Sequence, residues 1–138
     1  MNTRGGPARY GSDVVVDMLK ALDIEFVALN PGSSYRWIHD SLVNYGGNTK
    51  PEVITVGNEG IAVAIAHGYA KAKGRPMAAA LHDTVGLLWA GNGIFNAWCD
   101  RVPILLMVGN GPMDVTTGRP TWDWFHTAEL PGHLVGTT

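Results

Sequence analysis

The chain has 138 residues, of which 46% are hydrophobic and 16% are charged, and its formal net charge is -2. This length provides one compact domain with a core, but not two domains. The small negative charge excludes the basic surface used to bind nucleic acid or an anionic membrane. The single cysteine, Cys99, excludes an internal disulfide and fits a reducing compartment. Without an apolar stretch of signal-peptide or membrane-spanning type, a cytoplasmic protein is expected.

Helical and strand patterns alternate along the chain after a polar leader at residues 1–10. Ser12 is expected to be the N-cap of the first helix, in which Asp13 suits the positive end of the helix dipole and apolar residues recur at helical spacing to Leu22. Further helices are predicted at residues 35–43, 59–73 and 85–100, with a possible short one at 122–129. Apolar strands are predicted at residues 25–29, 52–56, 77–81 and 104–108.

This alternation predicts a three-layer α/β/α domain with a mostly parallel sheet, of the flavodoxin-like kind. Right-handed crossovers place all loops that lead from a strand into a helix at one edge of the sheet, where open parallel sheets bind ligands. The loops in question are residues 30–34, 57–59 and 82–84, the most polar interruptions between apolar segments.

Glu59 stands at a junction between a strand and a helix and has two interpretations. As an ordinary carboxylate at a helix N-terminus it contributes about 0.3–1 kcal/mol. The helix that follows is rich in alanine and glycine, which predicts close contact with another element. Burial in such an apolar setting favours the protonated form of a carboxyl group, as a proton relay requires.

The other polar residues give weaker indications. His82 follows an apolar strand and either transfers protons or bonds to the backbone. The turn at residues 30–34 is more typical of a helix cap, by Ser33 or Ser34, than of an anion site. No histidine pair lies with a carboxylate at zinc-ligand spacing, so no metal site is predicted. Cys99 is expected to be buried, and Trp89 and Trp98 to lie in the core or at a subunit interface.

Four segments in this order resemble the N-terminal pyrimidine-binding domain of thiamine diphosphate-dependent enzymes. They are the Asn-Pro-Gly-Ser turn at residues 30–33, the Val-Gly-Asn-Glu-Gly segment with its alanine-rich helix at 56–70, the segment 91–98, and its continuation through 100–104 to Gly109. The resemblance covers about residues 11–112 and is greatest to the group of acetolactate synthase and benzoylformate decarboxylase. It implies thiamine diphosphate as cofactor and a 2-oxo acid as substrate.

The resemblance also implies roles for individual residues. Glu59 would hydrogen-bond N1′ of the aminopyrimidine and promote the tautomer that removes the proton from C2 of the thiazolium. Ser33 would hold the substrate carboxylate, and His82 would protonate intermediates, which favours decarboxylation over carboligation. Pro31, Gly32 and Asn92 would contribute to cofactor binding.

Family members bind the diphosphate and its Mg²⁺ through a separate domain with a Gly-Asp-Gly stretch, which this sequence lacks. Residues 11–138 are therefore expected to be a pyrimidine domain without middle and diphosphate-binding domains, inactive unless a diphosphate-binding domain or subunit, in a homo-oligomer or a split enzyme, completes the site. Nucleic acid and membrane are not expected partners. The alternatives are a fragment of an acetolactate synthase-type carboligase, a non-catalytic truncated interaction domain, and a mononucleotide-binding domain of another class.

Overall fold

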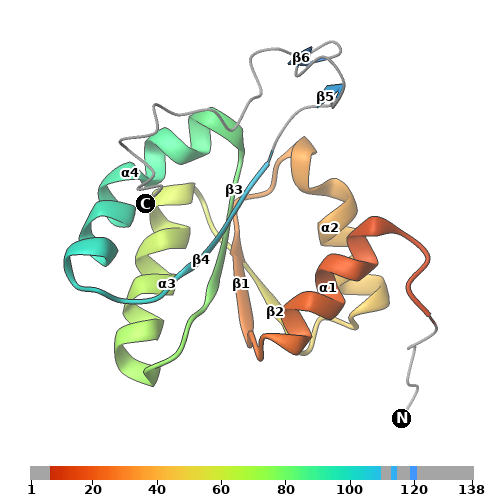
Figure 1. The fold of residues 1–138 in the computed structure, drawn as a ribbon, viewed down its shortest axis with the longest axis horizontal. Coiled ribbons are helices and arrows are strands. Elements are labelled where there is room, and N and C mark those ends of the chain that lie inside the picture. The colour runs from red at the N-terminus through yellow and green to blue at the C-terminus, as the bar shows by residue number, and fades with distance from the viewer. Residues whose placement is uncertain (1–6, 110–112, 115–118, 121–138) are drawn as a thin grey trace.

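Four parallel strands form the central sheet, in the spatial order β2-β1-β3-β4 (Figure 1). Their bounds are β1 (Phe26–Leu29), β2 (Glu52–Thr55), β3 (Ala78–Leu81) and β4 (Leu105–Val108). The computed structural model describes residues 7–109, 113–114 and 119–120. The last two pairs form a short antiparallel ladder of β5 (Met113–Asp114) and β6 (Arg119–Pro120). Residues 1–6 of the predicted leader at residues 1–10, and the possible helix at 122–129, lie outside the described residues.

Helices cover both faces of the sheet. α1 (Gly11–Ala21) and α2 (Arg36–Asp40) lie on one face, and α3 (Glu59–Lys73) and α4 (Asp83–Cys99) lie on the other (Figure 1). The predicted three-layer architecture with a parallel sheet is therefore confirmed, and each of the four strands has ends within one residue of its prediction.

The strand order places a topological switch point, here called the crevice, between β1 and β3. After β1 the chain passes through α2 on one face, whereas after β3 it passes through α4 on the opposite face. The two loops that leave these neighbouring strands therefore diverge at the carboxyl edge of the sheet. Such a switch point is where open parallel sheets bind ligands.

The second helix differs from the continuous helix predicted at residues 35–43. A 3₁₀ turn, η1 (Ser33–Tyr35), precedes α2, and a π-helical segment, η2 (Ser41–Tyr45), follows it. The Gly46 amide donates to the Ser41 carbonyl at 2.7 Å, which is the hydrogen bond of a π turn. A Cβ at Gly46 would lie 2.7 Å from the Leu42 carbonyl oxygen, so this wide turn depends on glycine.

The first helix begins earlier than predicted, and its cap is a different residue. Its N-cap is Tyr10, and the expectation that Ser12 would cap it is wrong. Asp13 instead reaches back, and its Oδ2 accepts the backbone amides of Arg9 at 2.9 Å and Tyr10 at 3.1 Å. Its Oδ1 accepts the Ser41 hydroxyl at 2.7 Å, which ties α1 to η2. A carboxylate satisfies several donors at once, whereas a serine hydroxyl satisfies fewer.

Asp13→Asn is expected to destabilise the fold at neutral pH and to have a diminishing effect in acid. Hydrogen bonds from the Ser41 hydroxyl and then from the Arg9 amide hold the pKa of Asp13 below its ordinary value of 3.8. A carboxyl group whose pKa is lowered by folding stabilises the fold above its unfolded pKa, and this contribution disappears as the pH falls through the folded pKa. Urea midpoints of both proteins across this range measure the difference. The exposed Asp40→Asn is the control, and a difference independent of pH would contradict the assignment.

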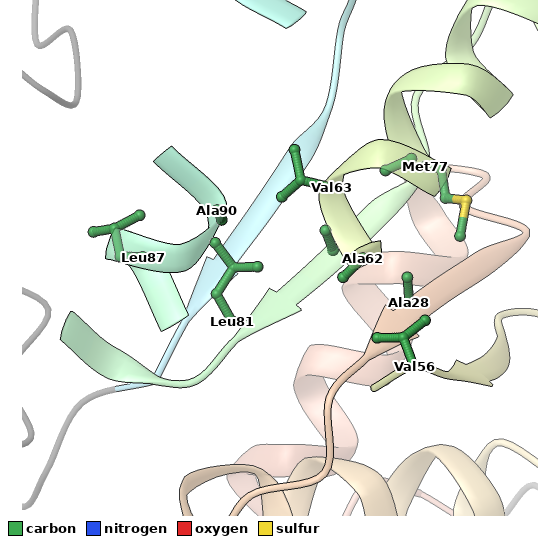
Figure 2. Close-up of a cluster of buried hydrophobic side chains, with 10 residues drawn as sticks. Ala28, Val56, Ala62, Val63, Met77, Leu81, Leu87 and Ala90 are labelled. Atoms are coloured by element: carbon green, nitrogen blue, oxygen red, sulfur yellow. The ribbon is translucent and has the colours of Figure 1, made fainter. Parts of the chain in front are cut away.

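Buried side chains form one cluster on each face of the sheet. Ala79 and Leu81 of β3 belong to the cluster beneath α3 and α4, whereas Ala78 and Ala80 belong to the cluster beneath α1 and α2. Figure 2 shows the first cluster, in which labelled residues of both helices surround Leu81. Because β3 presents alanine to both sides, the helices approach the central strand closely. The labelled residues are Ala28, Val56, Ala62, Val63, Met77, Leu81, Leu87 and Ala90.

The outer side of α4 is apolar and exposed. Trp89 is 66% exposed and Trp98 is 72% exposed, so neither lies in the core of the chain, and their place at a subunit interface stays a prediction. Cys99, the last residue of the helix, is also exposed, so its predicted burial is wrong. Among the described residues, no helix has the combination of length and apolarity that crossing a membrane requires.

Candidate functional site

Three loops meet at the crevice, and each contributes one polar group to a single cluster. Asn30 follows β1, Glu59 begins α3 after β2, and His82 follows β3. The Asn30 side-chain amide donates to Glu59 Oε1 at 3.1 Å. The backbone amide of His82 donates to the same oxygen at 3.3 Å. Residues far apart in sequence therefore converge on one carboxylate.

Glu59 does not act as the cap of its helix. The N-cap of α3 is Asn58, whose side-chain oxygen accepts the backbone amide of Ile61 at 3.0 Å. The Glu59 side chain turns instead towards the neighbouring loops and is only 5% exposed. The Glu59 carboxylate is therefore buried without serving as the cap of its helix.

The hydrogen bonds of Glu59 distinguish its two oxygens. Oε1 accepts from both Asn30 and His82, and hydrogen bonds to a charged acceptor are each worth about 1.5–3 kcal/mol. A hydrogen on Oε1 would compete with these two donors. The two hydrogen bonds therefore hold the Glu59 side chain through Oε1.

Backbone packs directly against the polar side chains of the cluster at three glycines. A Cβ at Gly86 would lie 2.8 Å from Glu59 Cγ, and one at Gly32 would lie 3.2 Å from His82 Nδ1. A Cβ at Gly109 would lie 2.7 Å from Ser34 Oγ. Main-chain atoms, rather than side chains that could move aside, therefore restrict the positions of these three side chains.

His82 contacts two side chains through its ring. Ser34 Oγ lies 2.6 Å from Nδ1, and Asp83 Oδ2 lies 3.2 Å from Nε2. Asp83 is fully buried and has a φ of 34°, in the left-handed region that aspartate and asparagine tolerate better than most residues. Residues in such conformations cluster at functional sites.

Tyr35 follows Ser34 in η1 and is buried. It is only 2% exposed, and its hydroxyl donates to the Met107 carbonyl at 2.6 Å. Burial raises the pKa of Tyr35 above its ordinary value of 10.0, and the negative charge of Glu59 raises it further. The phenol therefore stays neutral and acts as a hydrogen-bond donor that joins η1 to β4.

The predicted site residues are not all brought together. Glu59, His82 and Gly32 lie in the cluster, whereas Ser33 and Pro31 are exposed beside it. Asn92 is exposed on α4, about 13 Å along the helix axis from Asp83 at 1.5 Å per residue. The roles predicted for these residues remain predictions.

Sequence reasoning missed four residues that the structure adds to the cluster. Asn30 could have been found, because it directly follows a strand at the ligand-binding edge. The sequence indicates Ser34 only as a candidate helix cap, and Asp83 only as the neighbour of His82. Gly86 gave no signal, since a glycine in the first turn of a helix does not reveal which side chain lies opposite it.

Two further kinds of site, a metal site and a cavity, were looked for in the described part of the chain. Among the described residues, no group of three or more histidine, cysteine, aspartate or glutamate side chains is placed to hold a metal ion. A cavity of about 950 Å³ opens between the residues that precede α1 and the segments α2 and η2. None of the predicted site residues lines it, so it is separate from the crevice.

Comparison with known families gives one match that covers most of the chain. Residues 9–128 match the family described as thiamine pyrophosphate enzyme, N-terminal TPP binding domain. Among solved structures, benzoylformate decarboxylase from Polynucleobacter necessarius superposes with a TM-score of 0.68, covering 85% of this chain and 20% of that one. At 21% identity, this second similarity concerns the fold alone.

Two acetolactate synthase large subunits are similar in sequence. The protein of Lactococcus lactis subsp. lactis (strain IL1403) is 31% identical over 106 residues, which are 76% of this chain and 18% of that protein. The protein of Haemophilus influenzae (strain ATCC 51907 / DSM 11121 / KW20 / Rd) is 32% identical over 99 residues, which are 72% and 17% of the two proteins. The chain therefore spans less than a fifth of the length of these relatives.

Proposed function

The chain belongs to the family of N-terminal TPP-binding domains of thiamine pyrophosphate enzymes, and on this premise we propose that it is the pyrimidine-binding half of a 2-oxo acid decarboxylase or carboligase. The family binds thiamine diphosphate, and its acetolactate synthase and decarboxylase members are similar to this chain. The observation that carries the proposal is the buried Glu59 carboxylate, held at Oε1 by Asn30 and the His82 amide in the crevice.

The residues of the crevice fit an aminopyrimidine. A carboxyl group that is buried and fixed through one oxygen can present the other to a ring nitrogen, and Glu59 Oε2 is the atom that would face N1′. Gly86 leaves no space between α4 and Glu59, so the carboxylate cannot withdraw towards that helix. The diphosphate and Mg²⁺ would be held by a diphosphate-binding domain of the same enzyme.

Thiamine diphosphate, when bound, supplies a thiazolium that accepts the electron pair released as a 2-oxo acid loses carbon dioxide. The chain's own contribution is to move a proton. Glu59 gives and takes the proton at Oε2, while the donors on Oε1 keep the carboxyl group in one orientation. Burial keeps water from competing for that proton, and such positioned proton transfer contributes about 10²–10⁴-fold in rate.

His82 favours a decarboxylase over a carboligase. Its backbone amide donates to Glu59 and its ring contacts Ser34, both at the same edge of the sheet, where the ring can protonate the product of carbon dioxide loss. The sequence similarity to acetolactate synthase large subunits supports the carboligase as the second candidate.

A reconstitution experiment tests the proposal. The chain is mixed with a diphosphate-binding domain of this family, thiamine diphosphate and Mg²⁺, and carbon dioxide and aldehyde or 2-hydroxy ketone are measured from a panel of 2-oxo acids. We expect carbon dioxide release that requires both proteins and the cofactor, with aldehyde as the main product. A mixture that binds no cofactor and releases no carbon dioxide would favour a non-catalytic interaction domain. Binding of a flavin or other mononucleotide by the chain alone, measured by calorimetry, would favour another class.

A further inference from the structure

The cavity of about 950 Å³ lies where three parts of the chain meet. The residues that precede α1, the first turn of α1 itself, and α2 with η2 all contribute to its lining. Ligand pockets have volumes of about 300–1,000 Å³ and combine apolar walls with a few polar groups. The cavity therefore has the size of a site for a small molecule, on the face of the sheet that α1 and α2 cover.

An aromatic residue from each of these parts lines the cavity. Tyr10 is the N-cap of α1, Trp37 belongs to α2, and Tyr45 is the last residue of η2. Tyr10 and Trp37 are exposed, so solutes can reach their rings. The face of an aromatic ring attracts a cation within about 6 Å of its centroid. Tyr45 shows this behaviour within the chain, because the Lys20 ammonium nitrogen lies 5.3 Å from the centroid of its ring.

A buried carboxylate also lines the cavity. Asp13 accepts the Ser41 hydroxyl on Oδ1 and the amides of Arg9 and Tyr10 on Oδ2. These hydrogen bonds, that of Ser41 first, hold the pKa of Asp13 below its ordinary value of 3.8. Asp13 is therefore ionised at neutral pH, and its position is fixed by three donors from two elements.

The charges of the lining favour a cation over an anion. Its charged residues are Arg9, Asp13 and Asp40, so one positive and two negative charges leave a net charge of -1 at neutral pH. The Arg9 guanidinium acts on Asp13, whose pKa it helps to lower. Asp40 is exposed, so its charge is accessible from solvent. Aromatic faces and carboxylates both attract positive charge, and both disfavour an anion.

The shape of η2 is a separate indication of a site. Ser41, Asn44 and Tyr45 all belong to this π-helical segment and all line the cavity. Single π-helical turns within α-helices are rare and occur frequently at functional sites. The wide turn depends on Gly46, where a Cβ would lie 2.7 Å from a backbone oxygen. The unusual backbone of η2 therefore contributes three neighbouring side chains to one cavity.

We propose that this cavity binds a small organic cation, an ammonium group with an apolar body, among the rings of Tyr10, Trp37 and Tyr45. The rings take up the apolar body and the charge together, and Asp13 and Asp40 add long-range attraction. The site is independent of the proposed function, since none of the lining residues, as far as the structure describes the chain, belongs to the polar cluster of the crevice.

Choline and 3,3-dimethyl-1-butanol are matched probes for this site, because they share one shape and differ in charge. Each is titrated into the ¹⁵N-labelled chain without cofactor, at equal ionic strength, and ¹H–¹⁵N correlation spectra are recorded. We expect choline chloride to cause saturable shifts of amide signals around the cavity, and the alcohol to bind about 10-fold more weakly. Equal binding of the two probes would overturn the choice of a cation. Shifts that do not saturate with choline would overturn the site itself.

Variants locate the bound cation. Trp37→Ala is expected to weaken choline binding about 10-fold, whereas Trp37→Phe retains a ring and should bind with intermediate affinity. Trp98→Ala makes the same change at an exposed tryptophan on α4, on the opposite face of the sheet, and should bind as the unaltered chain does. Equal affinity of Trp37→Ala and Trp98→Ala would contradict the aromatic site.

Arg9→Gln tests the charge of the lining. The substitution removes a like charge and keeps the backbone amide that Asp13 accepts, so choline should bind about 2–5-fold more tightly. Unchanged or weaker binding in Arg9→Gln would contradict the electrostatic argument. These measurements need neither thiamine diphosphate nor a diphosphate-binding domain. Failure of the reconstituted mixture to release carbon dioxide would therefore leave their outcome unaffected.

Discussion

Glu59→Gln is expected to lower the turnover of the reconstituted enzyme by about 10²–10⁴-fold with little change in folding stability. Glutamine has nearly the same shape as glutamate, and its amide oxygen can take the place of Oε1 as acceptor for Asn30 and for the His82 amide. Its amide nitrogen then takes the place of Oε2. That nitrogen donates hydrogen bonds, but an amide does not act as an acid or a base near neutral pH. Proton transfer therefore fails while the hydrogen bonds remain.

Exchange of the C2 proton of bound thiamine diphosphate for deuterium measures this effect without a substrate, and carbon dioxide release measures it with one. Glu52→Gln is the matched control, because it makes the same chemical change at an exposed carboxylate on β2. We expect the control to exchange and react at the rate of the unaltered chain. Equal rates for Glu59→Gln and the control would remove Glu59 from the mechanism.

Gly86→Ala is expected to destabilise the chain by about 1–3 kcal/mol, as overpacking does, and to weaken cofactor binding and turnover. The added Cβ would lie 2.8 Å from Cγ and 2.9 Å from Oε1 of Glu59, closer than atoms in contact can approach. Either α4 moves away from α3 or the carboxylate leaves Asn30 and His82. Both adjustments disturb the oxygen that the hydrogen bonds hold in place.

The same substitution in the same helix provides the control. A Cβ at Gly91 meets nothing within 4 Å, and the position is exposed. Gly91→Ala is therefore expected to stabilise the helix by up to about 1 kcal/mol, through helix propensity alone. Urea unfolding of the two variants should give changes of opposite sign. Equal stabilisation by both would show that α4 does not approach Glu59 as closely as described.

The sequence is sufficient to predict the fold because its signals are local. Strands without polar alternation, separated by helical patterns, indicate a parallel sheet, and the ends of the strands identify the loops at the ligand-binding edge. This topology identifies both Glu59 and His82, since His82 directly follows β3 and Glu59 begins the helix after β2. The topology alone places both residues at the same edge of the sheet.

The remaining contacts depend on geometry that spacing does not encode. Ser34 rather than Ser33 meets His82 because a 3₁₀ turn, not a continuous α-helix, begins the segment after β1. Asp13 rather than Ser12 secures α1 because Ser41, from another element, donates to its carboxylate. Cys99 was expected to be buried from its residue type, yet its place at the end of α4 lies outside the buried stripe of the helix.

The alanines of β3 connect the polar cluster to side-chain volume in the interior. Ala79 faces the cluster of α3, which carries Glu59, and Ala80 faces the cluster of Tyr35, which adjoins Ser34. Larger side chains at Ala79 would press on α3, which carries Glu59, and larger ones at Ala80 would press on Tyr35, the neighbour of Ser34. The two halves of the polar cluster can therefore change independently during evolution, through buried residues that lie outside the cluster.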